Sequence, residues 1–300
     1  PPRWTGAQRL ELIATLTALK SWDEAAASIR SLQQGATGGL AKELRWRMAN
    51  LLFERRRHYN EALVALEEVI RDGAPYADRA AFLRAQTLSR LDRDEEAIVA
   101  YREWGRTTAD RGRVDEALFY AARLAFYLGR HGEALSALRA IVGDGTGKTK
   151  KGSLSADTAR DAHFLAGMSA FLEKNYSGAQ VHFTAASKGS SVEEAVERNT
   201  YWAAVSALEQ NPSAGAPSLR ALCDADPTSW YAFFAAIRLA EKGEETGDCP
   251  LLPSNDSGDA SGAVEEVIAG PEKPSLPLEE ISDAAALFAR MGLFREAAKR

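Results

Sequence analysis

Apolar residues between positions 201 and 239 recur at helical spacing and predict three consecutive helices. Tyr201, Ala204, Val205 and Leu208 fall at i, i+3, i+4 and i+7, which places them on one face of a helix. The pair at 211–212, Asn-Pro, predicts the end of this first helix.

The second of these helices is expected to begin at Pro217, because proline suits a first helical position. Its apolar face consists of Leu219, Leu222 and Cys223. The dipeptide 226–227, Asp-Pro, predicts its end.

The third helix follows this break and carries the densest apolar stripe of the chain. Thr228 or Ser229 can cap its N-terminus. The stripe that we expect to face the core consists of Trp230, Phe233, Phe234 and Ile237.

The same hairpin pattern recurs along the chain, with an alanine in the first turn of each second helix. The instances are Trp22–Ala25, Tyr59–Ala62, Asp94–Ala97, His131–Ala134, Tyr176–Ala179 and Phe294–Ala297. The first five alanines are 37, 35, 37 and 45 residues apart. A spacing of this kind is typical of helical repeats.

A large residue stands four positions after each of the first five alanines. These residues are Ile29, Leu66, Tyr101, Leu138 and Phe183. We expect each alanine to allow a close helix crossing, helped by small residues upstream such as those from Gly167 to Ala170. The large residue then packs against the next pair, because a single hairpin cannot bury its apolar face alone.

The pattern resembles the tetratricopeptide repeat (TPR), and Trp46, three residues before Ala49 and seven before Phe53, is its best match. The predicted fold is therefore all-α: an α-solenoid, a right-handed superhelix of TPR-like hairpins that can curve into an arc or a ring. The array is predicted over residues 1–240, a Pro/Gly/acid-rich connection over 241–280 and a final hairpin over 281–300. A solvated loop is expected at 143–155.

Charge is distributed unevenly. Residues 241–280 hold 11 acidic and 2 basic side chains, and since the chain has 42 acidic and 37 basic in all, the rest holds 31 and 35. This excess of +4 lacks a dense Lys/Arg run with aromatics, so nucleic acid is not indicated as a partner. The sequence also has no apolar run long enough to predict a membrane span.

The termini bear on localisation. The first ten residues do not form a signal peptide, which leaves open a processed export product or a trimmed chain. Arg300 falls within a predicted helix, so we expect the native chain to continue beyond it.

The two cysteines, Cys223 and Cys249, lie outside any CxxC or Cys/His cluster, and no zinc site is predicted. They could form a disulfide in an oxidising compartment or remain unpaired thiols. Both alternatives are open at this stage.

No residue is nominated as catalytic, cofactor-binding or metal-binding. The GTGKT at 145–149 lacks the first glycine of a phosphate loop, because Val142 stands at the required position and Gly143 is one position late. It is predicted to be a basic surface loop. The histidines are expected to serve packing or to lie on the surface, with a metal or general-base role as the alternative; they are His58, His131, His163 and His182. The Glu-Glu pairs fit helix starts better than acid/base couples.

Tryptophans can form a track that binds sugar or peptide. Trp22, Trp46, Trp104 and Trp230 stand at predicted packing positions and are expected in the core. Trp4 and Trp202 are the two that we expect to be freer.

The run TYWAAVSALEQNPSAGAPSLRALCDADPTSWYAFFAAIRL (200–239) resembles the superhelical region of soluble lytic transglycosylases. The family's helix ending in P.SYYG..A…L corresponds to Pro227, Ser229, Trp230, Tyr231, Ala235 and Leu239. Trp230 replaces the usual first tyrosine and Ala232 the glycine. The segment DAAALFARMGLFREAAKR (283–300) resembles the last hairpin before the family's catalytic domain, so that the likeness covers roughly residues 195–300.

The resemblance implies an exported, periplasmic or cell-envelope protein in which this region forms a ring that guides peptidoglycan glycan strands, with other cell-wall proteins as further partners. The family's catalytic Glu-Ser motif does not occur in residues 1–300, so no catalytic position can be transferred. The alternatives are a TPR-like adaptor that binds a protein or peptide in its concave groove, and a chain that keeps the likeness without an enzyme domain.

Overall fold

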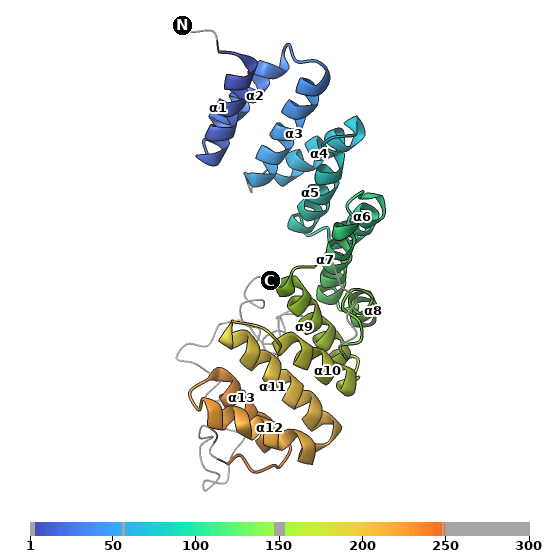
Figure 1. Ribbon diagram of the computed structural model, residues 1–300, viewed down its shortest axis with the longest axis vertical. Coiled ribbons are helices and arrows are strands. Elements are labelled where there is room, and N and C mark those ends of the chain that lie inside the picture. The colour runs from blue at the N-terminus through green and yellow to red at the C-terminus, as the bar shows by residue number, and fades with distance from the viewer. Residues whose placement is uncertain (1–3, 56–57, 147–153, 248, 250–300) are drawn as a thin grey trace, which may run out of the picture. The chain divides into compact units, whose positions relative to one another are not determined.

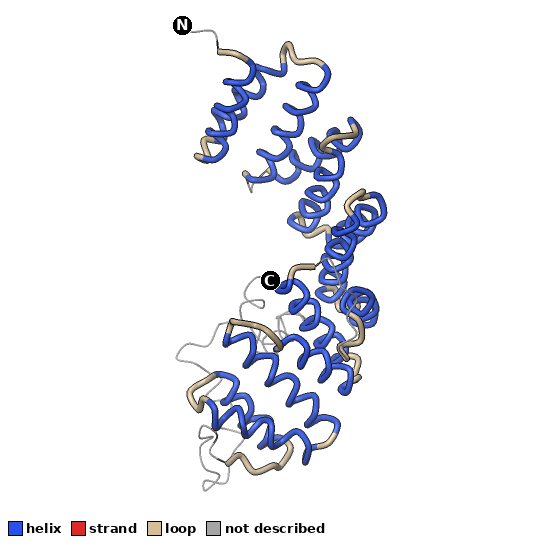
Figure 2. The backbone as a smooth tube through the Cα atoms, in the orientation of Figure 1, coloured by secondary structure: helices blue, strands red, loops and turns tan. Residues whose placement is uncertain are grey.

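The computed structural model describes residues 4–55, 58–146, 154–247 and 249. Within these ranges it holds thirteen α-helices and one short 3-10 helix, and no strand (Figure 2). The predicted all-α class is therefore confirmed.

The chain divides into two compact units within helix α7. The first comprises residues 1–125 with 151–155. Its helices are α1 (Gly6–Ala18), α2 (Trp22–Gln33), α3 (Gly38–Glu54), α4 (Tyr59–Asp72), α5 (Ala77–Arg90), α6 (Asp94–Thr107), η1 (Arg111–Arg113) and most of α7 (Val114–Tyr127). From α1 to α6, each helix packs against the next (Figure 1).

The second unit comprises residues 126–150 and 156–300. Its helices are α8 (His131–Val142), α9 (Ala156–Leu172), α10 (Tyr176–Ser187), α11 (Glu193–Gln210), α12 (Pro212–Ala225) and α13 (Trp230–Glu241). Here too each helix packs against its successor, and α11 also contacts α13 (Figure 1). Packing of each helix on its sequence neighbours defines an α-solenoid of helical hairpins. The right-handed superhelix and the arc or ring stay predictions.

The repeat pattern located the second helix of each hairpin to the residue. Helices α2, α4, α6, α8 and α10 begin at the five positions that open the predicted instances. The alanines of these instances are completely buried: Ala25, Ala62, Ala97, Ala134 and Ala179. The large residues four positions later are also buried, from Ile29 to Phe183. The sixth instance, Phe294–Ala297, lies outside the described residues.

The turns of four hairpins share one backbone feature. The residue two positions before the second helix has a positive φ: Lys20 (59°), Asp92 (57°), Gly129 (76°) and Lys174 (59°). This left-handed conformation reverses the chain in a short turn, and only glycine adopts it without a steric cost.

Helix α12 begins at Pro212, so the predicted start at Pro217 is wrong. The side chain of Asn211 accepts a hydrogen bond from the Ser213 amide at 3.1 Å and caps the helix directly. Pro212 takes the first helical position, and Pro217 lies inside the helix. The predicted end of the preceding helix at 211–212 is confirmed, because α11 ends at Gln210.

Helix α13 confirms its predicted cap but not its predicted core face. Ser229 accepts a hydrogen bond from the Ala232 amide at 2.9 Å. The buried residues of α13 are Ala232, Ala235, Ala236 and Leu239, whereas Trp230 is 74% exposed. The other three residues of the predicted stripe, Phe233, Phe234 and Ile237, are half-buried, and the ring of Phe234 lies 6.3 Å from that of Tyr201 on α11.

The expected loop at 143–155 is described only at 143–146 and 154–155. The predicted connection at 241–280 is described only through residue 247 and at 249, and the final hairpin at 281–300 lies outside the described residues. The division of the chain at 240 and 280 stays a prediction.

Candidate binding groove

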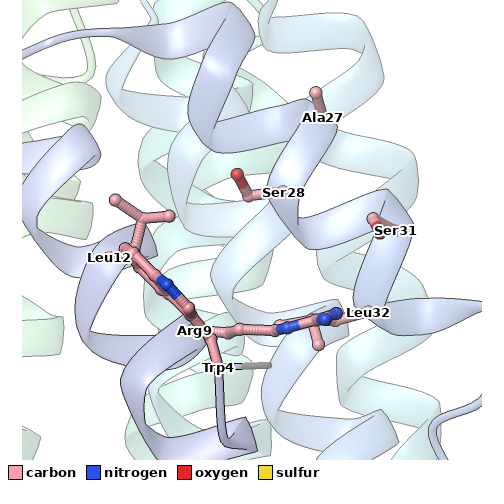
Figure 3. A pocket seen from close by; sticks show the side chains of 7 residues that line it. All are labelled: Trp4, Arg9, Leu12, Ala27, Ser28, Ser31 and Leu32. Carbon is pink, nitrogen blue, oxygen red and sulfur yellow. The ribbon is translucent and has the colours of Figure 1, made fainter. Parts of the chain in front are cut away.

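A groove lies between the first two helices of the first unit. Its lining residues are Trp4, Arg9, Leu12, Ala27, Ser28, Ser31 and Leu32, and its volume is about 420 Å³ (Figure 3). Figure 3 shows the Arg9 side chain extending from α1 toward α2, with Ser28 on the facing helix.

A helix cap positions the residues that line the groove on the α1 side. Thr5 caps α1 through a reciprocal capping box: its hydroxyl accepts from the Gln8 amide at 3.3 Å, and its own amide donates to Gln8 Oε1 at 2.9 Å. This cap sets the direction in which the chain enters the helix at Trp4. Arg9 follows in the second turn, and Leu12 lies three residues further on the same face.

The α2 side of the groove presents small and polar side chains. Ala27, Ser28 and Ser31 follow one stripe of α2, on the flank next to the buried Ile29. In the described part of the chain, neither serine hydroxyl makes a hydrogen bond. Both are therefore available to a ligand in the groove.

Arg9 is exposed, and no carboxylate of the described residues forms an ion pair with it. Other arginines of the same unit are paired: Arg47 with Glu43 at 2.8 Å, and Arg55 with Asp23 at 2.9 Å. The groove thus combines an indole ring, a guanidinium group and two hydroxyls. This arrangement can bind and orient a ligand.

The structure confirms part of the tryptophan prediction. Trp4 is 46% exposed at the groove, as expected, and Trp46 and Trp104 are buried. Trp202, expected to be free, is only 2% exposed and packs edge-on against Phe171.

The two wrong predictions, Trp202 and Trp230, both concern which face of a helix its neighbours bury. Helix α11 packs against α10 on one side and α12 on the other, so a residue off its main stripe is still buried. Helix α13 buries Ala232, Ala235, Ala236 and Leu239, and Trp230, its first residue, lies off this buried face.

The fold brings together two histidines that the sequence did not suggest as a pair. The Nδ1 atoms of His163 (α9) and His182 (α10) lie 3.2 Å apart, so one ring donates a hydrogen bond to the other. Both side chains are buried, and Nε2 of His182 has no hydrogen-bond partner in the described part. Burial, followed by the neighbouring His163, lowers the pKa of His182 to about 4.

The other two histidines are packing or surface residues. The His131 ring lies 5.3 Å from that of Phe126, and burial lowers its pKa. His58 pairs with Glu61 at 3.1 Å. Among the described residues, no group of three or more side chains is arranged to hold a metal ion.

Two Glu-Glu pairs lie at helix starts, and the described part of the GTGKT segment lies in a turn. Glu193 and Glu194 stand in the first turn of α11, and Glu96 pairs with Arg93 at 2.7 Å. Only residues 145–146 of the GTGKT segment are described; Asp144 accepts a hydrogen bond from the Thr146 amide there.

The cysteine alternatives are resolved in favour of a disulfide. Cys223, buried on α12, is bonded to Cys249, which follows α13. No helix among the described residues is long and apolar enough to cross a membrane.

The packing of consecutive helices and the buried alanines at their crossings define the described part of the chain as an α-solenoid of helical hairpins. Among solved structures, it is similar to the crystal structure of the P58(IPK) TPR domain, with a TM-score of 0.28 and 15% identity over 98% of this chain and 80% of that one. No family model and no curated protein matches the sequence.

Proposed function

We propose that this chain is the non-catalytic scaffold region of an exported lytic transglycosylase and that it holds peptidoglycan glycan strands. In this proposal, the cleavage chemistry lies outside residues 1–300. The observation that carries the proposal is the disulfide between Cys223 and Cys249.

The disulfide supports an exported location. Disulfides persist in oxidising compartments such as the bacterial periplasm and are rare in the cytosol. The bond closes a loop of 26 residues and ties the chain after α13 back to α12. Such a bond stabilises the folded array because it constrains the unfolded chain.

The position of the disulfide also supports the proposal. It links Cys223 on α12, within the segment at 200–239 that resembles soluble lytic transglycosylases, to Cys249 after α13. In this segment Gly215 approaches the backbone of Leu208 so closely that a Cβ would lie 2.2 Å from its nitrogen. A tightly packed, covalently closed end is suited to carry a neighbouring domain.

The groove between α1 and α2 gives the scaffold a surface that suits a glycan. Trp4 offers an amphipathic ring, and the hydroxyls of Ser28 and Ser31 can exchange hydrogen bonds with sugar hydroxyls. We assign to this groove the role of holding the strand.

The test is co-sedimentation of the oxidised 300-residue chain with purified peptidoglycan sacculi. We expect the chain to sediment with sacculi and to release no muropeptides by itself. We expect a longer native form to release anhydro-muropeptides. A chain that stays in the supernatant at all protein concentrations overturns the proposal.

Two variants make this test specific. Trp4→Ala should reduce sedimentation, whereas Trp230→Ala, the same change at an exposed tryptophan on α13, should not.

A TPR-like adaptor that binds a protein is the second candidate, and the exposure of Trp230 favours it. An exposed tryptophan with half-buried aromatic neighbours on α13 is typical of protein interfaces. If sacculi are not bound, and a purified cell-envelope protein is bound by the wild-type chain but not by Trp230→Ala, the adaptor function is supported instead.

A further inference from the structure

We propose that the groove between α1 and α2 recognises a sugar that itself carries a carboxylate, namely muramic acid in glycan strands from which the stem peptides have been removed. This inference rests on the proposed function and specifies which part of the strand the scaffold contacts.

The first step is the charge of the groove. Arg9 lines it without a carboxylate partner among the described residues, and the groove's other lining residues are uncharged. The nearest acid along α1, Glu11, is two residues away and therefore points to another side of the helix. A guanidinium group in this position is suited to a carboxylate, which it can hold with two parallel hydrogen bonds.

The second step is the ring beside it. Trp4 is 46% exposed and lines the same groove as Arg9. An indole that keeps this much exposed surface can cover the apolar face of a hexose. The ligand should therefore present an apolar ring face and an anion together.

The third step is the size of the groove. The groove measures about 420 Å³, at the small end of the range for ligand pockets. A groove of this size suits one compact acidic sugar better than a sugar with an attached peptide. The lactyl carboxylate of muramic acid becomes free when the stem peptide is removed, which places ring and charge on one residue.

The fourth step is the rigidity of the site. The capping box of Thr5 and Gln8 defines the first turn of α1 between Trp4 and Arg9. Ser28 and Ser31 lie on α2, which is held to α1 through the buried core around Ile13 and Ile29. Arg9, Ser28 and Ser31 are thus carried by packed helices, and Trp4 directly precedes the cap of α1, so less conformational entropy is lost on binding.

The experiment measures the affinity of the full 300-residue chain for three probes by isothermal titration calorimetry. The probes are glycan strands denuded with an amidase, the same strands with their stem peptides, and neutral chitooligosaccharides of similar length. We expect the denuded strands to bind about tenfold or more tightly than chitooligosaccharides, the size of effect expected for one charge-assisted contact.

The variants separate charge from stacking. Arg9→Gln should abolish the preference for denuded strands over chitooligosaccharides, and Trp4→Ala should weaken binding of both. Arg30→Gln, a change at an exposed arginine of α2 outside the groove, should alter neither.

The outcomes distinguish recognition of the muramic acid carboxylate from glycan binding in general. Equal affinity for denuded strands and chitooligosaccharides overturns the carboxylate inference but leaves glycan binding in place. Preference for strands with stem peptides also overturns it and assigns the recognition to peptide carboxylates. Absence of binding to all three probes and to sacculi overturns the proposed function as well.

Discussion

The ring of Phe183 occupies the space that a side chain on Gly167 would need: a Cβ at Gly167 would lie 2.7 Å from two ring carbons. Gly167 belongs to α9 and Phe183 to α10, so the missing side chain of one helix accommodates the aromatic residue of the other. Phe183 is completely buried at this crossing.

Replacing Gly167 with alanine should destabilise the protein. Phe183 sits in a filled core and cannot withdraw without displacing its neighbours, so overpacking should cost about 1–3 kcal/mol. Urea unfolding followed by circular dichroism measures the loss. Gly39→Ala in α3, where a Cβ would meet nothing within 4 Å, is the control and should be neutral or stabilising. Equal effects at both positions would contradict the role of the crossing.

Removal of the disulfide should lower stability without changing the fold. The double variant Cys223→Ser/Cys249→Ser frees a loop of 26 residues, which should cost about 3 kcal/mol. Thermal unfolding measures the change, and reduction of the wild-type chain should produce a similar shift. Alkylation of unreduced protein from its native cell should label no cysteine; labelling of both would contradict an oxidising location.

The pair of His163 and His182 should make stability depend on pH. Burial lowers the pKa of both rings, that of His182 from 6.5 to about 4, so the folded chain binds fewer protons than the unfolded chain. The free energy of unfolding is therefore highest above pH 6.5, where both rings are neutral in either state. It falls by on the order of 2 kcal/mol as the pH decreases toward 4.

The double variant His163→Leu/His182→Leu tests this dependence. It removes both hydrogen-bonding partners together, so no buried polar group is left behind. Its free energy of unfolding should vary less between pH 7 and pH 4 than that of the wild type. An unchanged slope in the double variant would contradict the assignment.

Tryptophan substitutions should have opposite consequences on α11 and α13. Trp202→Ala removes a buried ring that packs against Phe171 and should cost about 3–5 kcal/mol. Trp230→Ala removes a ring that is 74% exposed and should change stability by about 0.5 kcal/mol or less. Acrylamide quenching of tryptophan fluorescence gives an independent measure: Trp230→Ala should remove a readily quenched part of the emission.

A glycine at the left-handed turn position should stabilise the hairpins that lack one. Lys174 has a φ of 59° in the turn before α10, where the α8 hairpin has Gly129 in the equivalent place. Lys174→Gly removes the steric cost but adds freedom to the unfolded chain, so a net gain of about 0.5–1 kcal/mol is expected. Chemical denaturation measures it. Lys188→Gly, at a φ of −68°, should give no gain.

The candidate groove was only partly accessible to sequence reasoning. Trp4 was expected to be free because it stands outside every repeat position. Arg9, Ser28 and Ser31 were not singled out, since an isolated arginine and two serines are ordinary surface residues. The polar stripe on α2 is the signal that could indicate them, but their approach to α1 depends on how the hairpin closes.

The sequence by itself determined the helical class, the start of the second helix in the five described hairpins marked by the alanine pattern, and the buried residues at their crossings. These features depend on local spacing, such as the four residues between Ala179 and Phe183, and local spacing is read directly from the chain. It also indicated Ser229 as a helix cap, since capping involves only neighbouring residues.

Only the tertiary structure decided which face of a helix is buried when that helix has two neighbours or a small-residue surface. This is why Trp202 is in the core and Trp230 is not. The same holds for residues far apart in the chain that meet, such as His163 with His182 and Cys223 with Cys249. Such contacts depend on the angle and register at which helices pack, and these follow from the summed packing of many side chains rather than from any local pattern.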